Sequence, residues 1–148
     1  MTAIDKALYY LNIKPRTRQQ VIDYLQKKEF DQDEIDAAVR ELEEYRYIDD
    51  YNYCQLYFEM GFEKSRGIGR IKRELLSKGV DKEIIEEALE NLEQVPDQYD
   101  MARQLAESIV QTLHEEDKQK LKAKLARRLA GRGFAADVVY RTVNQVIR

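Results

Sequence analysis

Helix-breaking residues are scarce in this chain of 148 residues, which contains only six glycines and two prolines. It also has a single cysteine, Cys54. One cysteine excludes an internal disulfide and a metal site built from cysteines within one chain. We expect Cys54 to be a small apolar residue of the core, and the composition favours a protein made mainly of helices.

Long apolar segments are also missing. No stretch approaches the roughly 20 apolar residues that are needed to cross a bilayer. Met1 is followed by Thr2-Ala3-Ile4-Asp5, a helix-capping pattern rather than a signal peptide, so we expect a cytoplasmic protein without a membrane contact. Charged residues make up 36% and the mean hydropathy is −0.68, yet the apolar positions are strongly periodic, which argues against disorder.

Motifs of nucleotide-binding and catalytic sites are absent as well. Gly67-Ile68-Gly69 begins a helical pattern, but it matches neither the dinucleotide fingerprint nor the Gly-Lys-Ser/Thr phosphate loop. His114 is the only histidine, and a lone exposed histidine is rarely a metal ligand or a base. We therefore expect no catalytic residue, no metal and no cofactor, and we predict that the protein is not an enzyme.

The stretch Gly67–Glu93 has the pattern of two amphipathic helices joined by a short connection. Ile68, Ile71 and Leu75 share one side of the first helix. Gly79 suits a left-handed position just past a helix end, and Asp81 is a suitable N-cap for the next helix. The apolar residues of this second helix are Ile84, Ile85, Ala88, Leu89 and Leu92.

The same pattern occurs 50 positions earlier and, more weakly, 54 positions later. The earlier copy contains Val21, Leu25, Phe30, Ile35, Ala38, Val39 and Leu42. The later copy contains Leu125, Leu129, Gly133, Phe134, Val139, Val143 and Val146. A period near 50 residues indicates a repeat array, in which each repeat buries its apolar face against its neighbours.

Each repeat begins with one further helix. In the first repeat this helix starts at Ala3. In the second repeat Asp50 is its predicted N-cap, and in the third repeat the helix extends to about Leu113. We predict an all-α fold with nine helices and no strand. It consists of three tandem three-helix repeats, residues 1–49, 50–96 and 97–148, that form an elongated, curved array.

Charge is distributed unevenly along the chain. Residues 118–148 contain nine Lys or Arg and one acid, which leaves the first 117 residues at a net charge of −11. Basic residues recur at one location in two successive repeats, at the spacing i, i+4 and i+7 that places them on one helix face. This basic stripe comprises Arg66, Arg70 and Arg73, then Lys120, Lys124 and Arg127, while the first repeat retains only Arg16.

Three interpretations of the basic stripe are open. Stacked repeats would join it into a ridge that neutralises the phosphates of single- or double-stranded nucleic acid, with an affinity that falls as salt rises. The same ridge would fit an acidic groove on a protein. The third interpretation is a solvated helix face without a function.

Tyrosines crowd the connection between the first and second repeats. Exposed rings beside arginines stack on bases in many proteins that bind single strands. More often such rings fill a helix junction while the hydroxyl reaches water. The tyrosines concerned are Tyr45, Tyr47, Tyr51, Tyr53 and Tyr57.

Several segments together resemble the RecX family of bacterial recombinase regulators. These are Gly67-Ile68-Gly69-Arg70-Ile71 with Glu74-Leu75, Lys78-Gly79-Val80, the connection Tyr47-Ile48-Asp49-Asp50, and the opening Arg16-Thr17-Arg18. The resemblance covers nearly the whole chain and is most specific from Tyr47 to Leu92. One departure is Glu29, which stands where such proteins often carry glycine.

The resemblance implies three-helix modules that bind along the groove of a RecA–DNA filament and inhibit its ATPase, recombinase and strand-exchange activities in DNA repair. The basic stripe is then the expected contact surface, and whether it touches DNA or protein stays open, as does capping of the filament versus binding along its groove. We expect a monomer, because no heptad pattern is sustained. The alternative function is a helix-turn-helix transcription regulator that binds DNA directly.

Overall fold

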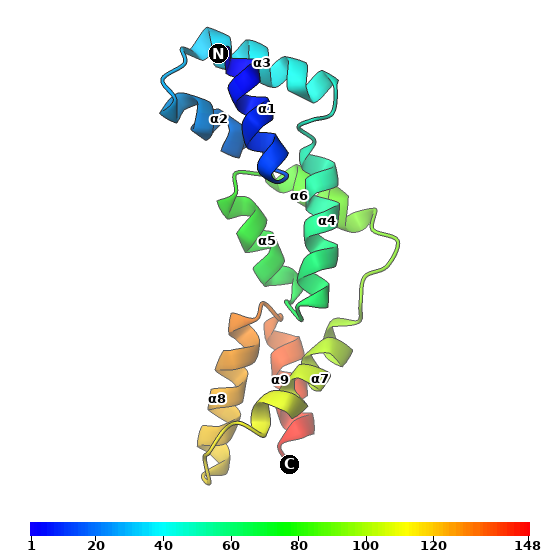
Figure 1. Ribbon diagram of the computed structural model, residues 1–148. Helices are drawn as coiled ribbons and strands as arrows, with labels where there is room; N and C mark the ends of the chain where they lie inside the picture. The colour runs from blue at the N-terminus through cyan, green and yellow to red at the C-terminus, as the bar shows by residue number, and fades with distance from the viewer. The chain divides into compact units, whose positions relative to one another are not determined.

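The computed structural model describes all 148 residues, and its nine helices without a strand confirm the all-α prediction (Figure 1). The helices are α1 (Ala3–Ile13), α2 (Arg18–Lys27), α3 (Gln32–Glu44), α4 (Asp50–Glu63), α5 (Ile68–Ser77), α6 (Lys82–Glu90), α7 (Gln98–Val110), α8 (Lys118–Gly131) and α9 (Ala136–Val146). None of them combines the length and the apolar character that crossing a membrane requires.

Side chains at the helix starts explain where the first helices begin. Thr2 and Asp5 form the expected capping box of α1, in which Asp5 N donates to Thr2 Oγ1 at 3.2 Å and Thr2 N donates to Asp5 Oδ2 at 3.1 Å. Thr17 and Gln20 form a second capping box at α2. Asp31 caps α3 by accepting a backbone N–H at 2.8 Å. Each cap satisfies amides that have no partner inside the helix.

Of two further predicted N-caps, the one at Asp50 is wrong and the one at Asp81 is in position. Asp50 is the first residue of α4, and its carboxylate instead accepts the backbone N–H of Arg18 at 2.8 Å. The preceding Asp49 caps α4, by accepting a backbone N–H of the first turn at 3.0 Å. Asp81 is the N-cap of α6, as predicted, but its carboxylate makes no capping bond, and the N–H of Ile84 donates to the Asp81 carbonyl at 3.1 Å instead.

Two helices end earlier than the periodicity predicts. Asn91 ends α6, so Leu92 lies beyond the helix; asparagine is a weak helix former. Leu113 lies beyond α7. The hydroxyl of Thr112 donates to the carbonyl of Ile109 at 2.7 Å, which occupies the acceptor that Leu113 would need to continue the helix.

The helices belong to two compact units. The first unit comprises residues 1–56 and 75–91, and the second comprises residues 57–74 and 92–148. The boundary passes through α4 and α5, so each of these helices contributes one end to each unit. The first unit contains α1, α2, α3 and α6, and the second contains α7, α8 and α9.

Each unit has an apolar core that is supplied largely by the repeated positions. The buried residues of the first core are Ala3, Ala7, Val21, Leu25, Ile35, Ala38, Val39, Leu42 and Ile48. Those of the second core are Ala102, Ala106, Ile109, Leu125, Leu129, Phe134, Val139, Val143 and Ile147. Cys54 is fully buried, as predicted, and burial raises the pKa of its thiol to about 12.

Within the first unit, the start of α2 lies against the end of α5. Thr17 Oγ1 donates to the carbonyl of Lys78, just beyond α5, at 2.7 Å. The next residue, Gly79, has a φ of +86°, which confirms the predicted left-handed position. A Cβ at Gly79 would lie 2.6 Å from Cγ of Gln19. Both the conformation and the close approach therefore require glycine.

A corresponding contact joins α5 to α8 within the second unit (Figure 1). Gly67 N donates to the carbonyl of Arg132 at 2.6 Å, and Gly69 N donates to that of Gly133 at 3.0 Å. Gly133 has a φ of +96°, and a Cβ there would lie 2.8 Å from Cα of Arg70. The contact pairs N–H groups at the start of one helix with carbonyls at the end of another, and neither set has a full complement of partners within its own helix.

We call these two contacts the junctions, and they correspond under the sequence repeat. Thr17 and Gly67 are 50 positions apart, and Gly79 and Gly133 are 54 positions apart. Glu29 stands 50 positions before Gly79 and shares its left-handed conformation, with a φ of +66°, but its side chain is exposed. A side chain fits there at a conformational cost of about 1–2 kcal/mol, because no helix start lies against it.

We predict that G133A lowers the free energy of unfolding by at least about 2 kcal/mol, because alanine is strained at this φ and its Cβ would meet the backbone of Arg70. Gly131 provides a matched control, since it ends α8 with open space around its Cβ position. G131A should raise the free energy of unfolding by about 0.5–1 kcal/mol. Urea unfolding followed by circular dichroism measures both, and equal effects would contradict the structural role of the junction.

Candidate functional site

The basic stripe is divided between the two units. Arg16 lies in the first unit, whereas all the other stripe residues lie in the second. Arg66 precedes α5, so only Arg70 and Arg73 of the first trio are on the helix. The second trio lies on α8 and comprises Lys120, Lys124 and Arg127.

Glu74 on α5 forms ion pairs with two arginines of the stripe. Arg66 Nη1 lies 3.2 Å from Oε1 of Glu74, and Arg70 Nε lies 3.5 Å from Oε2. The hydroxyl of Tyr57 donates to Oε1 of the same carboxylate at 3.3 Å. Burial, reinforced by the charge of Glu74, raises the pKa of Tyr57, so its hydroxyl stays protonated and able to donate. The side chain of Arg66 is only 18% exposed, so this arginine is largely covered.

The remaining cations of the second unit are more open. Lys124 Nζ lies 3.2 Å from Oε1 of Glu115, in an ion pair whose lysine side chain is 42% exposed. Arg73, Lys120 and Arg127 are exposed and have no ion-pair partner. These three side chains are the stripe residues that a phosphate or a carboxylate of a partner reaches without displacing an internal acid.

The sequence pattern did not assign Glu74 and Arg132 to this surface, and it indicated Tyr57 only as one of the clustered tyrosines, without its bond to Glu74. Glu74 follows Arg70 by four positions, and this spacing is a recognisable signal of a helical ion pair. Arg132 Nη1 donates to the carbonyl of Lys64 at 3.2 Å. These partners are 68 positions apart, so no local pattern indicates their contact.

Arg16 belongs to a stacked arrangement in the first unit. Its guanidinium lies 4.0 Å from the ring centroid of Tyr10, which in turn stacks on Tyr24 with centroids 4.0 Å apart and planes within 2°. Lys28 Nζ lies 5.6 Å from the Tyr24 centroid on this stack. Arg16 Nε is buried without a hydrogen-bond partner. Cation–π contact with tyrosine therefore orients this guanidinium, and no carboxylate pairs with it.

The two units carry opposite net charges. The first unit contains ten Lys or Arg and 17 Asp or Glu, a net charge of −7. The second contains 15 Lys or Arg and 11 Asp or Glu, a net charge of +4. Each unit therefore favours a different kind of partner surface.

A pocket of about 490 Å³ in the first unit is lined by several acidic side chains. Arg18 Nε pairs with Glu43 Oε1 at 3.2 Å, and the lining also includes Asp49, Asp50 and Asp81. Burial raises the pKa of Asp50 despite its hydrogen bond from the Arg18 backbone, and the charges of Glu43 and Asp81 raise it further.

The tyrosines of α4 and of the segment between α3 and α4 divide into two groups. Tyr45 and Tyr47 are 69% and 60% exposed. Tyr51, Tyr53 and Tyr57 are half-buried. The interpretation that such rings fill the space between packed helices therefore suits the second group, and the first group is open to a partner.

No group of three or more His, Cys, Asp or Glu side chains is placed to hold a metal ion. His114 is exposed in the connection between α7 and α8. The chemistry that this arrangement offers is the binding of charged groups through side-chain cations and carboxylates.

Three family models match the chain in sequence order. They are described as the first, second and third three-helix domains of RecX, and they match residues 3–42, 49–89 and 96–143. Together they cover nearly the whole chain.

Relatives named "Regulatory protein RecX" align along most of the chain. The protein of Clostridium beijerinckii is 32% identical over 99% of this chain, that of Clostridium tetani is 32% identical over 95%, and that of Lactococcus lactis is 35% identical over 89%. The alignments span 69%, 65% and 50% of the lengths of these relatives, so the chain is shorter than they are.

Solved structures share the fold. The crystal structure of RecX from Lactobacillus salivarius is 27% identical with a TM-score of 0.83, and the match covers 97% of this chain and 94% of that one. A second crystal structure, of regulatory protein RecX, has the same TM-score at 23% identity and covers 97% of this chain and 70% of that one.

We predict that E74Q lowers the free energy of unfolding by about 1–3 kcal/mol, because the largely covered Arg66 loses a charged partner. The matched control is E107Q, which weakens an exposed pair between Arg103 and Glu107 that has the i, i+4 spacing of the Arg70–Glu74 pair. That change should cost less than about 0.5 kcal/mol. Chemical denaturation of both variants measures the difference, and an effect of E74Q no larger than that of E107Q would contradict the role of Glu74.

The raised pKa of Asp50 predicts a pH-dependent effect of D50N. In the window from the ordinary value of 3.8 up to the raised value, the folded state binds more protons at Asp50 than the unfolded state, so stability falls as pH rises. Asparagine does not titrate, and its oxygen can still accept the N–H of Arg18. The stability of D50N relative to the original protein should therefore increase between pH 3 and pH 7, and thermal unfolding across this range measures it. A constant difference would contradict the assignment.

Proposed function

Because the chain belongs to the RecX family, we propose that it binds the RecA recombinase or the RecA–DNA filament and inhibits its ATPase, recombinase and strand-exchange activities in DNA repair. The observation that carries this proposal is the match of three consecutive RecX domains to residues 3–143 of the chain. Relatives that align along most of the chain are named as regulatory proteins, which supports a regulatory role.

The basic stripe of the second unit is the proposed contact surface. Arg73, Lys120 and Arg127 offer open charges, and Arg70 is fixed at a junction by the approach of its backbone to Gly133. A fixed backbone positions the charge with little further loss of conformational entropy on binding. Arg16 contributes a separate cation in the first unit. The surface would meet phosphates of the filament DNA or acidic side chains of its protein.

The charges at the third helix of each module argue against the alternative, a helix-turn-helix transcription regulator. In such proteins the residues at the start of the recognition helix touch base edges in the major groove. Here the first turn of each of these helices carries acidic residues: Asp33 and Glu34 in α3, Glu83 in α6 and Asp137 in α9. The first turns of α3 and α9 contain no basic residue. Carboxylates at these positions would repel the phosphates that flank the groove.

We further propose that residues 1–49, 50–96 and 97–148 act as three modules of a cytoplasmic, monomeric regulator. The junctions support this division, since each one holds a helix start of one module against a helix end of the next. Each module then brings its own surface to the filament.

We predict that the charge reversals R70E and K124E, combined in one protein, weaken inhibition of a RecA filament by about tenfold or more, because they replace two attractive contacts with repulsive ones. The measurement is ATP hydrolysis by RecA filaments on single-stranded DNA, titrated with the protein at several salt concentrations. Circular dichroism checks that helicity is kept.

The matched control combines R103E and K122E, which lie on α7 and α8 outside the basic stripe. Arg103 forms an i, i+4 ion pair with Glu107, and Lys122 bonds to Asn144 at 3.3 Å, so the control changes net charge equally and removes comparable contacts. Inhibition by the control should stay near that of the original protein. Equal losses in both variants would reduce the effect to net charge, and unchanged inhibition by R70E/K124E would remove the stripe from the mechanism.

A further inference from the structure

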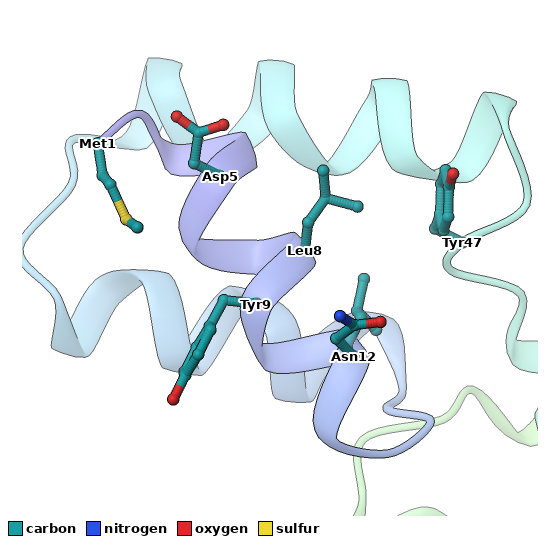
Figure 2. A pocket seen from close by; sticks show the side chains of 7 residues that line it. Met1, Asp5, Leu8, Tyr9, Asn12 and Tyr47 are labelled. Carbon is teal, nitrogen blue, oxygen red and sulfur yellow. The ribbon is translucent and has the colours of Figure 1, made fainter.

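A pocket of about 600 Å³ lies beside α1 in the first unit, and its lining is mostly apolar (Figure 2). Figure 2 shows Asp5, Leu8 and Asn12 following one side of α1, with Tyr47 beyond the end of α3. Tyr9 and Met1 complete the labelled lining. Neither Arg16 nor the stripe residues of the second unit line this pocket, which we call the α1 pocket.

The α1 pocket gathers large apolar side chains that the fold leaves in solvent. Tyr9 is 62% exposed and Tyr47 is 60% exposed, although aromatic rings of this size normally contribute to a core. Single exposed apolar residues need no explanation, but several that line one pocket are typical of an interaction site. Tyrosine is also among the residues that contribute most to binding when a partner covers it.

The charged side chains that line the pockets on this face of the first unit are acidic, and the α-ammonium group of Met1, near Asp5, is the one cation that they meet here. Asp5 lines the α1 pocket, while Glu34 and Glu41 line a neighbouring pocket of about 320 Å³ between α1 and α3. Hydrogen bonds from the backbone and hydroxyl of Thr2 lower the pKa of Asp5, so this carboxylate stays ionised at neutral pH. A surface of carboxylates repels the phosphates of nucleic acid and attracts Lys and Arg side chains.

We propose that the α1 pocket binds a protein segment of the recombinase subunits, one that inserts an apolar side chain between Tyr9 and Tyr47 and places Lys or Arg beside Asp5 and Glu41. This inference rests on the proposed function, because it assumes the filament as the partner. It separates two kinds of contact: the first unit binds protein through an apolar, acidic face, and the second unit presents cations.

The test compares binding to two probes, RecA filaments on single-stranded DNA and the same DNA without RecA. The variants are Y9A combined with Y47A, which removes the apolar walls, and E41K, which reverses the charge of an exposed side chain at the neighbouring pocket. We expect each to weaken filament binding by about tenfold or more and to leave binding to the DNA alone unchanged.

Matched controls come from exposed positions away from this face. Y140A truncates a tyrosine that is 75% exposed on α9, and E90K reverses an exposed glutamate at the end of α6. Both should bind the filament like the original protein. Circular dichroism and urea unfolding identify any variant that loses binding by losing its fold, and in that case the milder Y47S and E41Q replace it.

Each outcome decides the proposal. Loss of filament binding in the pocket variants alone supports it. If the original protein binds the filament and the folded pocket variants bind equally well, the α1 pocket inference fails while the proposed function stands. If the pocket variants also lose binding to DNA alone, the pocket contacts nucleic acid and the inference is overturned. If the original protein binds no filament, the proposed function fails and this inference with it.

Discussion

The start of one helix lies against the end of another at both junctions, and this contact fixes how α5 packs against α2 in the first unit and against α8 in the second. A helix leaves amides without partners at its start and carbonyls without partners at its end. At the junction in the second unit, carbonyls beyond α8 accept the amides of Gly67 and Gly69. At the junction in the first unit, the hydroxyl of Thr17 reaches the carbonyl of Lys78. Neighbouring modules thereby satisfy backbone groups that would otherwise need solvent.

The close approach of backbones at the junctions decides which residues are possible there. Gly79 and Gly133 combine a left-handed conformation with the absence of space for a side chain. Glu29 has the same conformation at an exposed position, where only the conformational cost applies. Arg70 faces Gly133 through its backbone, so a residue of the basic stripe is also part of a junction. Structure and proposed function therefore share one location.

Electrostatics gives the two units different capacities for recognition. The second unit has an excess of cations, of which Arg66 and Arg70 share an ion pair with Glu74, whereas Arg73 and Arg127 stay open. The first unit has an excess of acids and exposes tyrosines beside them. The proposed function would use surfaces of both kinds, because the phosphates and the basic side chains of a filament attract opposite charges.

Local sequence patterns predict the all-α fold, the repeat and much of the core, because apolar periodicity and capping residues act over a few positions. Leu25 and Leu129, for example, are buried as their spacing predicts. The sequence placed Gly79 correctly in a left-handed turn, but not the cap at Asp50, whose carboxylate is drawn to the start of α2 instead. Only the tertiary structure decided which cations are paired and which apolar rings stay exposed. Those properties depend on neighbours distant in the chain, which no local pattern of residues specifies.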